Sequence, residues 1–335
     1  MTHGFLLGKF MPPHSGHVFL CETARRLVDR LTILVCSLAH DPIPGALRLE
    51  WMREMFPTCR VIGHDESAPQ APDEHPEFWA IWRRIVRSAH PEPIDLLFAG
   101  ENYGLRLAEE VGALFVPVGA RSEAGAAPSR HPISATRIRA APWEHWADVP
   151  AAVRPFFSRT ICLHGPESVG KTRLAARLAA HFETIWTPEY GRYHCQAHGT
   201  DLSVADLVLI GRTQSAMIAS SLPWCEKRLF VDPDALMTAA WSEMMLGEIP
   251  PALLHERRCD LYILLEDDVP FDQDGTRIYG DPERRSRFMA ISRRVLEQAG
   301  VPVVAVSGSW EKRFRQAVAA VENLPPPSFS AAERP

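Results

Sequence analysis

Short apolar runs and longer amphipathic stretches alternate along the first part of the chain. The apolar runs at 4–10, 31–38, 60–64, 95–100 and 114–118 are the size of strands, and the stretches between them have helical periodicity. Strands that alternate with helices predict a parallel sheet joined by crossover helices. In such sheets ligands bind where the strands end, so chemistry is expected just after each apolar run.

The same alternation begins again after a proline-rich segment, with a strand expected at 159–165. Further strands are expected to end around Thr187 and to span 228–232, 261–266 and 301–306. Helices are expected after them at 203–222, 234–246, 282–299 and 310–323. We therefore predict two doubly wound α/β domains, one over 1–155 and one over 156–325. The last segment, 326–335, is rich in proline and is expected to be a disordered tail.

Composition supports an ordinary folded protein and limits its partners. A chain of 335 residues suggests two domains, and a formal net charge of -5 lacks the basic footprint of a dedicated nucleic-acid binder. The seven cysteines include no C-x-x-C pair, and no apolar run is long enough for a signal peptide or a membrane span. We therefore expect a cytoplasmic protein with reduced thiols that does not insert into membranes.

The sharpest local pattern is Gly165-Pro-Glu-Ser-Val-Gly-Lys-Thr172, which fits G-x-x-x-x-G-K-[ST] between a strand and a helix. The glycines let backbone N–H groups and the helix N-terminus face a phosphate. Lys171 is expected to reach the β- and γ-phosphates of ATP, and Thr172 to offer its hydroxyl to Mg²⁺. The expected ATP contacts of this loop are Gly165, Glu167, Ser168, Val169, Gly170 and Thr172.

Acidic residues follow the next two strands of this half. Asp232 ends an apolar strand, where it can hold Mg²⁺ through water, while Asp234 and Glu189 are candidates to orient or deprotonate an acceptor hydroxyl. Acids at strand ends also serve as turn or N-cap residues, and that alternative stays open for each of them. Arg277, in a polar loop, is expected to close over the transferred phosphoryl group unless its segment is simply exposed.

The first half carries a different pattern directly after its first strand, Gly8-Lys-Phe-Met-Pro-Pro-His14-Ser-Gly16-His17. Histidines three residues apart share one face of a helix, and Gly16 permits close approach of a ligand. We interpret the two imidazoles as donors to phosphate oxygens at a helix N-terminus. A metal site and an uninvolved surface pair are the alternatives.

A second helix start, Ile133-Ser134-Ala-Thr136-Arg-Ile-Arg139, follows a loop rich in glycine, alanine and serine. Ser134 and Thr136 offer hydroxyl groups, and the Arg139 guanidinium offers a fork that fits a polyphosphate. Alone, such a segment is also compatible with an ordinary capped helix. Its occurrence together with H-x-G-H makes phosphate binding the favoured interpretation.

These motifs carry a family resemblance. H-x-G-H together with I-S-x-T-x-x-R resembles the nucleotidyltransferase superfamily. The combination of GKFMPPHSGH, ENYG, ISATRIR, GPESVGKT, PEYGRYH, FVDPDAL and VPFDQDGTRIYGDPERRSRF resembles the NadR-type bifunctional enzymes over nearly the whole chain. The resemblance implies a nicotinamide mononucleotide adenylyltransferase over 1–155 and a P-loop ribosylnicotinamide kinase over 156–325.

The resemblance also implies two reactions of ATP and their residues. In the kinase, Lys171, Thr172, Asp232 and Mg²⁺ hold ATP and its metal, and the nucleoside is held by Glu189, Tyr190, Arg192 or Asp234. In the transferase, the phosphate of the mononucleotide attacks the α-phosphorus of ATP, which yields NAD and pyrophosphate. There the stabilising groups are Lys9, His14, His17 and Arg139, with ATP contacts from Gly8, Phe10, Gly16, Gly100, Ser134 and Thr136. The kinase adenine is expected near Trp310.

A flat cationic nicotinamide ring favours an aromatic contact, and Trp79 and Trp82 are candidates, although tryptophans on an apolar helix face also form cores. The first motif begins at Gly8, so no helix-turn-helix domain and no direct DNA binding are expected. The partners are therefore small molecules, and a homo-oligomer remains possible. The alternatives are a sulfate-activating or coenzyme A type of transferase and kinase fusion, and a non-catalytic sensor of pyridine nucleotides.

Overall fold

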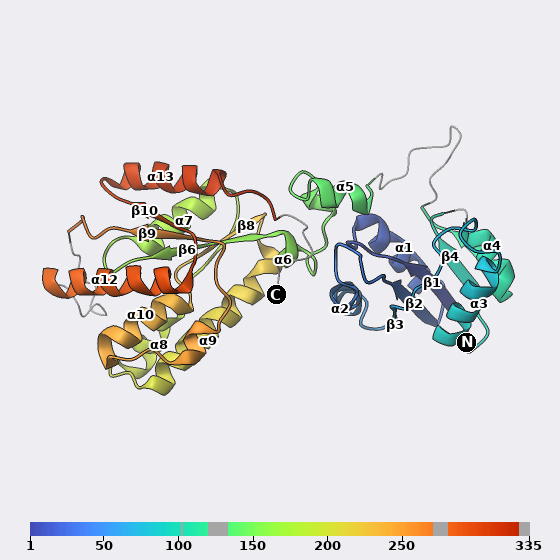
Figure 1. Cartoon of the computed structure of the whole chain (residues 1–335), viewed down its shortest axis with the longest axis horizontal. Helices are drawn as coiled ribbons and strands as arrows, with labels where there is room; N and C mark the ends of the chain where they lie inside the picture. The colour runs from blue at the N-terminus through green and yellow to red at the C-terminus, as the bar shows by residue number, and fades with distance from the viewer. Residues whose placement is uncertain (102, 120–132, 271–280, 328–335) are drawn as a thin grey trace. The chain divides into compact units, whose positions relative to one another are not determined.

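The computed structural model describes residues 1–101, 103–119, 133–270 and 281–327, which form two compact units, Met1–Val153 and Arg154–Pro327 (Figure 1). Each unit contains a five-stranded parallel sheet with helices packed against it. This confirms the predicted fold class of two doubly wound α/β domains. The expected contact of Arg277 and the tail from 328 onward lie outside the described residues.

The sheet of the first unit has the strand order β3-β2-β1-β4-β5, and every pairing in it is parallel. Its strands are β1 (His3–Gly8), β2 (Arg30–Cys36), β3 (Arg60–His64), β4 (Leu96–Ala99) and β5 (Leu114–Pro117). Its main helices are α1 (Ser15–Arg25), α2 (Gly45–Met55), α3 (Phe78–Ala89), α4 (Tyr103–Val111) and α5 (Ala135–Ala140). The strand order reverses between β1 and β4, and sheets of this kind bind ligands at the carboxyl ends of the strands at that point.

Both faces of this first sheet are covered, which explains why its strands are almost continuously apolar. Side chains alternate along β1, so that Leu6 packs with Ile33 in one buried cluster and Phe5 packs with Leu34 in the other. The cluster around Phe5 is completed by α3 and α4, and the cluster around Leu6 by α1 and α2. The two cores hold β1 in place from both faces of the sheet.

The second unit has the strand order β10-β9-β6-β8-β7, again parallel throughout. Its strands are β6 (Arg159–His164), β7 (Trp186–Thr187), β8 (Arg228–Val231), β9 (Leu261–Leu265) and β10 (Val303–Val306). Its helices are α6 (Arg154–Phe157), α7 (Lys171–His181), α8 (Tyr190–His198), α9 (Val204–Ser221), α10 (Ala235–Leu246), α11 (Pro251–Leu254), α12 (Pro282–Ala299) and α13 (Trp310–Glu322). β6 lies in the centre, so the loop that follows it opens at the middle of the sheet edge.

Two details of the second unit differ from the sequence prediction in extent. The strand expected to end near Thr187 has only two residues, and α8 follows it where no helix was expected. The helix α9 is capped at Ser203, whose hydroxyl accepts from the Asp206 backbone while the Asp206 carboxylate accepts from the Ser203 backbone.

Within the described ranges, no helix is both long and apolar enough to cross a membrane.

A buried imidazole makes the second unit sensitive to acid. His164 ends β6 and is fully buried, and neither of its ring nitrogens has a hydrogen-bond partner among the described residues. Burial, and then the nearby Lys171 ammonium, lower the pKa of His164 to about 3. The unfolded chain binds a proton here below its ordinary pKa of about 6.5, whereas the folded chain does not, so stability falls as the pH falls below that value.

We expect His164→Leu to reduce this acid sensitivity. Between pH 7 and pH 5 the wild type should lose about 2 kcal/mol of unfolding free energy through this one group, and the variant should not. Calorimetric melting of the second unit at both pH values measures the difference, and the exposed His255→Leu is the matched control. Equal pH dependence in all three proteins would contradict the prediction.

Candidate active sites

The loop between β1 and α1 brings the two predicted histidines together. His14 is the N-cap of α1, and its Nδ1 accepts a hydrogen bond from the Gly16 backbone N–H at 3.1 Å. This bond places the proton of the neutral His14 ring on Nε2, the nitrogen that can then donate to a phosphate oxygen. The His17 ring lies 3.8 Å from the His14 ring, measured between centroids. The pair therefore sits at a helix N-terminus, where an anion is favoured.

The residues before the histidines have two different roles. Lys9 is exposed at the end of β1, whereas the Phe10 side chain is only 1% exposed and packs in the core of the first unit. A Cβ at Gly8 would lie 3.3 Å from the Phe10 ring, so Gly8 leaves room for that ring. The expected ATP contact of Phe10 can therefore be made only by its backbone.

Arg139 joins the second predicted motif to the first. Its Nη1 donates to the Met11 carbonyl in the loop after β1, and its Nη2 donates to the Thr136 hydroxyl at 3.2 Å. Ser134 caps α5 by accepting from the Arg137 N–H. The two motifs are therefore adjacent in the fold.

Gly100 follows β4, the neighbour of β1 in the sheet. A Cβ at this position would lie 3.2 Å from the Val118 carbonyl oxygen. A glycine therefore lets the chain pass close to the loop after β5. Gly100 therefore lies at the carboxyl end of β4, next to β1, where the strand order reverses.

A buried arginine that the sequence analysis missed holds the same loop. Arg48, on α2, is fully buried and donates to the Lys9 carbonyl, to the Cys36 carbonyl at 3.0 Å and to the Asp41 carboxylate at 2.6 Å. It thereby ties the loop after β1 to the loop after β2. The only signal in the sequence is a charged residue at an inward position of an amphipathic helix.

The two tryptophans expected to contact nicotinamide pack in the core. Trp82 is 9% exposed, and its Nε1 donates to the Pro69 carbonyl at 2.9 Å. Trp79 packs edge-on against Phe78 at 4.9 Å between ring centroids. Both lie on the apolar face of α3, so their position supports the alternative of core packing.

The P-loop of the second unit wraps around the start of α7. Gly165 and Gly170 have positive φ angles of 133° and 85°, which a side chain would strain. Lys171 Nζ donates to the Gly165 carbonyl at 2.9 Å and to the Pro166 carbonyl at 2.8 Å, so its ammonium lies at the mouth of the loop. The loop opens into a cavity of about 340 Å³, which is also lined by Glu167, Ser168 and Thr172.

Asp232 provides a buried carboxylate beside this loop. It is fully buried after β8, and neither carboxylate oxygen has a hydrogen-bond partner among the described residues. Burial, and then Glu189, raise the pKa of Asp232 to about 6, while the Lys171 ammonium and the Thr172 hydroxyl oppose this rise. An unpaired buried carboxylate beside a P-loop threonine fits a divalent cation such as Mg²⁺.

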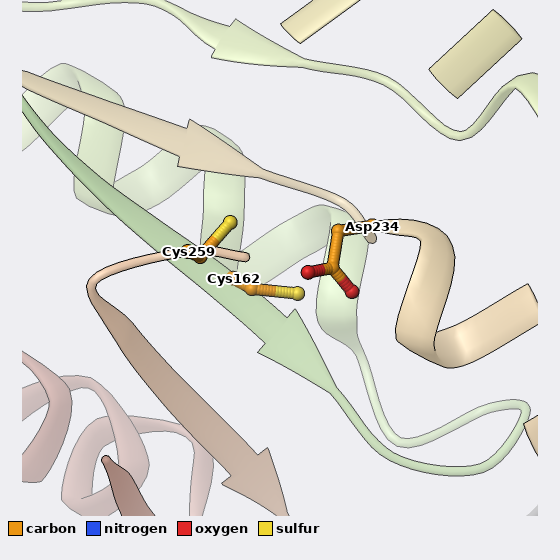
Figure 2. A group of neighbouring side chains, drawn as sticks. All are labelled: Cys162, Asp234 and Cys259. Carbon is orange, nitrogen blue, oxygen red and sulfur yellow. The ribbon is translucent and has the colours of Figure 1, made fainter. Parts of the chain in front are cut away.

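Asp234 lines the cavity and also lies in a buried cluster with two thiols (Figure 2). Its carboxylate caps α10 by accepting from the Leu236 N–H at 3.1 Å, and it also accepts from the Tyr262 hydroxyl. Burial raises the pKa of Asp234 and is opposed by these hydrogen bonds. This carboxylate therefore caps α10, and its two hydrogen bonds make Glu189 the better candidate among the acids that line the cavity.

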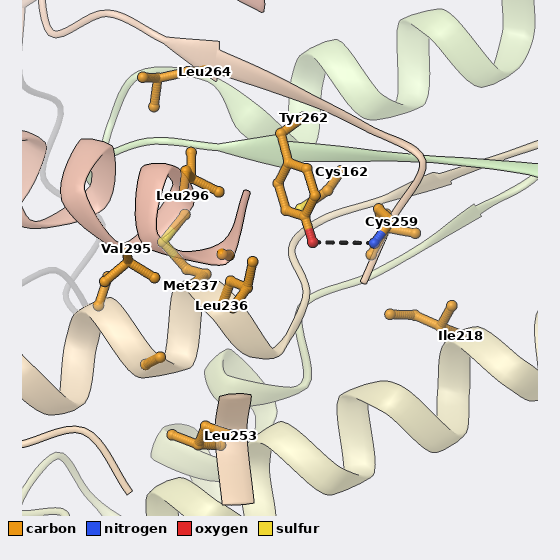
Figure 3. Packing of buried hydrophobic residues seen from close by; sticks show 14 of the residues in the cluster. Cys162, Ile218, Leu236, Met237, Leu253, Cys259, Tyr262, Leu264, Val295 and Leu296 are labelled. Atoms are coloured by element: carbon orange, nitrogen blue, oxygen red, sulfur yellow. Dashed lines mark hydrogen bonds between the residues drawn. The ribbon is translucent and has the colours of Figure 1, made fainter. Parts of the chain in front are cut away.

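The cluster around Asp234 is a hydrogen-bonded part of the core. The Tyr262 hydroxyl accepts from the Cys259 backbone N–H at 3.1 Å (Figure 3), and the ligand atoms of Cys162, Asp234 and Cys259 lie within 4.8 Å of one another. Thiols and a carboxylate are metal-ligand types, but here aliphatic side chains enclose them and the carboxylate already accepts two hydrogen bonds. The cluster is thus fully accounted for as a structural element.

The cavity is lined by two residues that the sequence analysis named and by several that it did not find. Glu189 and Arg192 line one side, with 3.9 Å between their charged atoms. Buried Gln214 fixes the start of α8 by accepting from the Tyr190 N–H at 2.8 Å and donating to the Pro188 carbonyl at 3.1 Å. The opposite side is formed by Met237, Thr238 and Trp241 of α10.

Trp310 lies against the P-loop. Its ring occupies the space that a Cβ on Gly170 would take, at 2.4 Å, and the Arg173 guanidinium lies 5.4 Å from the ring centroid. The ring is 41% exposed and lines the cavity. An aromatic face therefore borders the phosphate loop.

Comparisons with known proteins agree with the two-unit fold. The Cytidylyltransferase-like family model matches residues 5–141, and the AAA domain model matches residues 160–313. The trifunctional NAD biosynthesis/regulator protein NadR of Escherichia coli K12 is 29% identical over 96% of this chain and 83% of its own length. This chain is similar to NadR proteins over nearly its whole length. The NadR protein of Salmonella typhimurium LT2 is 28% identical with the same coverage.

The NadR fold is also recognisable in solved structures. A NadR protein crystallised with NAD and AMP-PNP superposes with a TM-score of 0.72 at 22% identity, covering 96% of this chain and 95% of that chain. The first unit alone resembles the nicotinamide-nucleotide adenylyltransferase of Haloarcula marismortui, at 30% identity over 32% of this chain and 57% of that protein. Both units thus follow the NadR architecture.

Gly170→Ala should selectively impair the P-loop of the second unit. The new methyl group would clash with the Trp310 ring at a φ angle that disfavours alanine, so we expect ATP affinity at this loop to fall at least tenfold. Titration with ATP and Mg²⁺ measures it, with Lys171→Ala defining the signal from the first unit.

The matched control is Gly199→Ala. Gly199 has a similar φ of 89° but nothing within 4 Å of its Cβ position. This variant should lose about 1 kcal/mol of stability and keep its ATP affinity. Equal affinities for Gly170→Ala and the wild type would refute the steric argument.

Proposed function

We propose that the chain is a bifunctional enzyme of NAD biosynthesis that uses ATP in both units. The second unit phosphorylates ribosylnicotinamide, and the first unit joins the resulting mononucleotide to the AMP part of a second ATP. The observation that carries the proposal is a complete set of phosphate-binding groups in each unit of a chain that is similar to NadR proteins. In the second unit these groups are Lys171 and Asp232, whose carboxylate has no hydrogen-bond partner among the described residues. In the first unit they are the adjacent rings of His14 and His17, together with Arg139, which bonds to the loop that contains them.

In the kinase reaction the 5′-hydroxyl oxygen of ribosylnicotinamide attacks the γ-phosphorus of ATP, and the bond from that phosphorus to ADP breaks. Lys171 neutralises charge on the phosphates, and Glu189 accepts the hydroxyl proton while Arg192 orients the ribose. Thr172 and Asp232 would hold Mg²⁺, which when bound offsets the negative charge of the phosphates.

In the adenylyl transfer a phosphate oxygen of the mononucleotide attacks the α-phosphorus of ATP, and pyrophosphate leaves. The mononucleotide itself is the nucleophile, so the protein contributes position and charge. His14 and His17 donate to oxygens on the reacting phosphorus, and Lys9 and Arg139 offset the charge of the leaving pyrophosphate. The neutral His14 ring suits this role because its Nδ1 is already engaged.

The nicotinamide ring of the kinase substrate fits against Trp241. This side chain lines the cavity beside Thr238, and its ring is held by Phe288 at 4.1 Å between centroids. The positive charge of the flat nicotinamide ring is attracted to the face of an aromatic side chain. The neighbouring Thr238 is neutral, so it adds no charge that would oppose this attraction. Trp241 is therefore our candidate for the aromatic contact of this substrate in the second unit.

Trp241→Leu should raise KM for ribosylnicotinamide about tenfold and leave KM for ATP unchanged, because a cation–π contact is worth about 1 to 2 kcal/mol. Trp241→Phe keeps an aromatic face and should recover most of the affinity. Steady-state kinetics with each substrate varied in turn provide the measurement. An equal rise in both KM values would point to a general disturbance of the cavity.

A product analysis tests both activities. Purified protein is incubated with ribosylnicotinamide, ATP and Mg²⁺, and the products are identified by mass. We expect NAD from the wild type, accumulation of the mononucleotide with His17→Ala, and no product with Lys171→Ala. The Lys171→Ala protein should still make NAD when supplied with the mononucleotide, which shows that its first unit is intact.

Other outcomes identify the alternatives. A wild type that makes NAD only from the mononucleotide would assign a different substrate to the kinase unit. A wild type that makes neither product would favour a sensor of pyridine nucleotides. The completeness of both sets of phosphate-binding groups speaks against that second role.

We also propose a reducing compartment, the cytoplasm, for this enzyme. All seven cysteines are free thiols, and five of them are buried. Burial raises the pKa of the Cys36 thiol to about 12 and of the Cys225 thiol to about 11, so these thiols stay protonated and unreactive. Such unpaired thiols are typical of proteins that work where disulfides do not form.

A further inference from the structure

Arg313 is a buried cation outside the groups discussed so far. It lies in the first turns of α13 and is 1% exposed. Its Nε donates to the Gly308 carbonyl at 2.9 Å, its Nη1 to the Val169 carbonyl at 3.2 Å, and its Nη2 to the Glu266 carbonyl at 3.0 Å. Nη2 also pairs with the Asp268 carboxylate. One guanidinium therefore serves four acceptors.

Those four acceptors belong to three separate loops. Val169 is part of the P-loop after β6, Glu266 and Asp268 follow β9, and Gly308 lies between β10 and α13. The Asp268 carboxylate also accepts from the Gly308 N–H at 2.6 Å, which closes the network. Arg313 thus connects the carboxyl ends of three neighbouring strands, β6, β9 and β10.

In the proposed kinase, two of these loops contact opposite ends of ATP. The P-loop faces the phosphates, and the loop containing Gly308 leads into Trp310, whose ring lies on Gly170 and 5.6 Å from the Arg313 guanidinium. The spacing between the phosphate site and the aromatic face depends on how these loops are held. The only cation that bonds to both of them among the described residues is Arg313.

We propose that Arg313 is a positioning residue that sets the distance between the phosphate-binding loop and the aromatic face, so that both ends of ATP are bound together. The inference rests on the proposed kinase function of this unit. A planar guanidinium has five N–H groups in a fixed fork, whereas an ammonium offers three from one point. The four acceptors in different directions therefore require arginine.

The test compares Arg313→Lys with Arg315→Lys, an exposed arginine on the same helix. Kinase kinetics are measured with ATP varied and with ribosylnicotinamide varied. For Arg313→Lys we expect KM for ATP to rise at least tenfold while KM for ribosylnicotinamide stays within twofold of the wild type. Arg315→Lys should match the wild type, and the adenylyl transfer of each protein serves as an internal control.

A second variant guards against loss of folding. Asp268→Asn keeps an acceptor for Gly308 but removes the charge that pairs with Arg313, so its KM for ATP should rise by a smaller factor. If Arg313→Lys and Asp268→Asn lower the melting temperature or kcat but leave KM for ATP unchanged, the positioning role is overturned and a structural role remains.

Failure of the proposed function would be distinct from failure of this inference. If the wild type does not phosphorylate ribosylnicotinamide, nucleotide affinity is measured instead by titration with ADP and Mg²⁺. The Lys171→Ala protein gives the binding signal of the first unit alone, which is then subtracted. A tenfold weaker Kd in Arg313→Lys would uphold the positioning role for whatever reaction this unit performs. An unchanged Kd would overturn it.

Discussion

In each unit, the loop that contains the phosphate motif is held from beneath by one buried arginine that donates to backbone carbonyls. Arg48 bonds to the Lys9 carbonyl in the first unit, and Arg313 bonds to the Val169 carbonyl in the second. A loop that must present N–H groups to an anion turns carbonyl groups the other way, and these need donors. A guanidinium with an acidic partner meets that need and carries no acceptor of its own.

This arrangement makes the two sites costly to alter one group at a time. Removing Asp41 or Asp268 would leave a buried cation without its counter-charge, and removing either arginine would leave several carbonyls unsatisfied. The Asp232 carboxylate differs from these acidic partners, because its oxygens have no hydrogen-bond partner among the described residues. The carbonyls behind the two phosphate loops are thus satisfied, whereas the carboxylate that is the candidate cation ligand is not.

Sequence reasoning succeeded where chemistry is written in consecutive residues. The P-loop and the H-x-G-H segment are local turns between a strand and a helix, so composition and order predict their place, and alternation of strands and helices predicts the fold. It could not assign roles that depend on distant partners in the fold. Asp234 looks like a catalytic acid until the contact with Tyr262 is known, and Trp82 resembles a ligand contact until α3 is packed. Arg48, Arg313 and Trp241 gain their roles only from tertiary contacts.

The contact between Gly170 and Trp310 links two residues that are far apart in the sequence. The indole ring fills the volume that any side chain at 170 would need, so the two positions share one space. A larger residue at 170 is compatible with this loop only if residue 310 becomes smaller, and a small residue at 310 leaves a void that 170 could fill. During divergence the pair is therefore constrained to change together, and a damaging substitution at one position has its natural suppressor at the other.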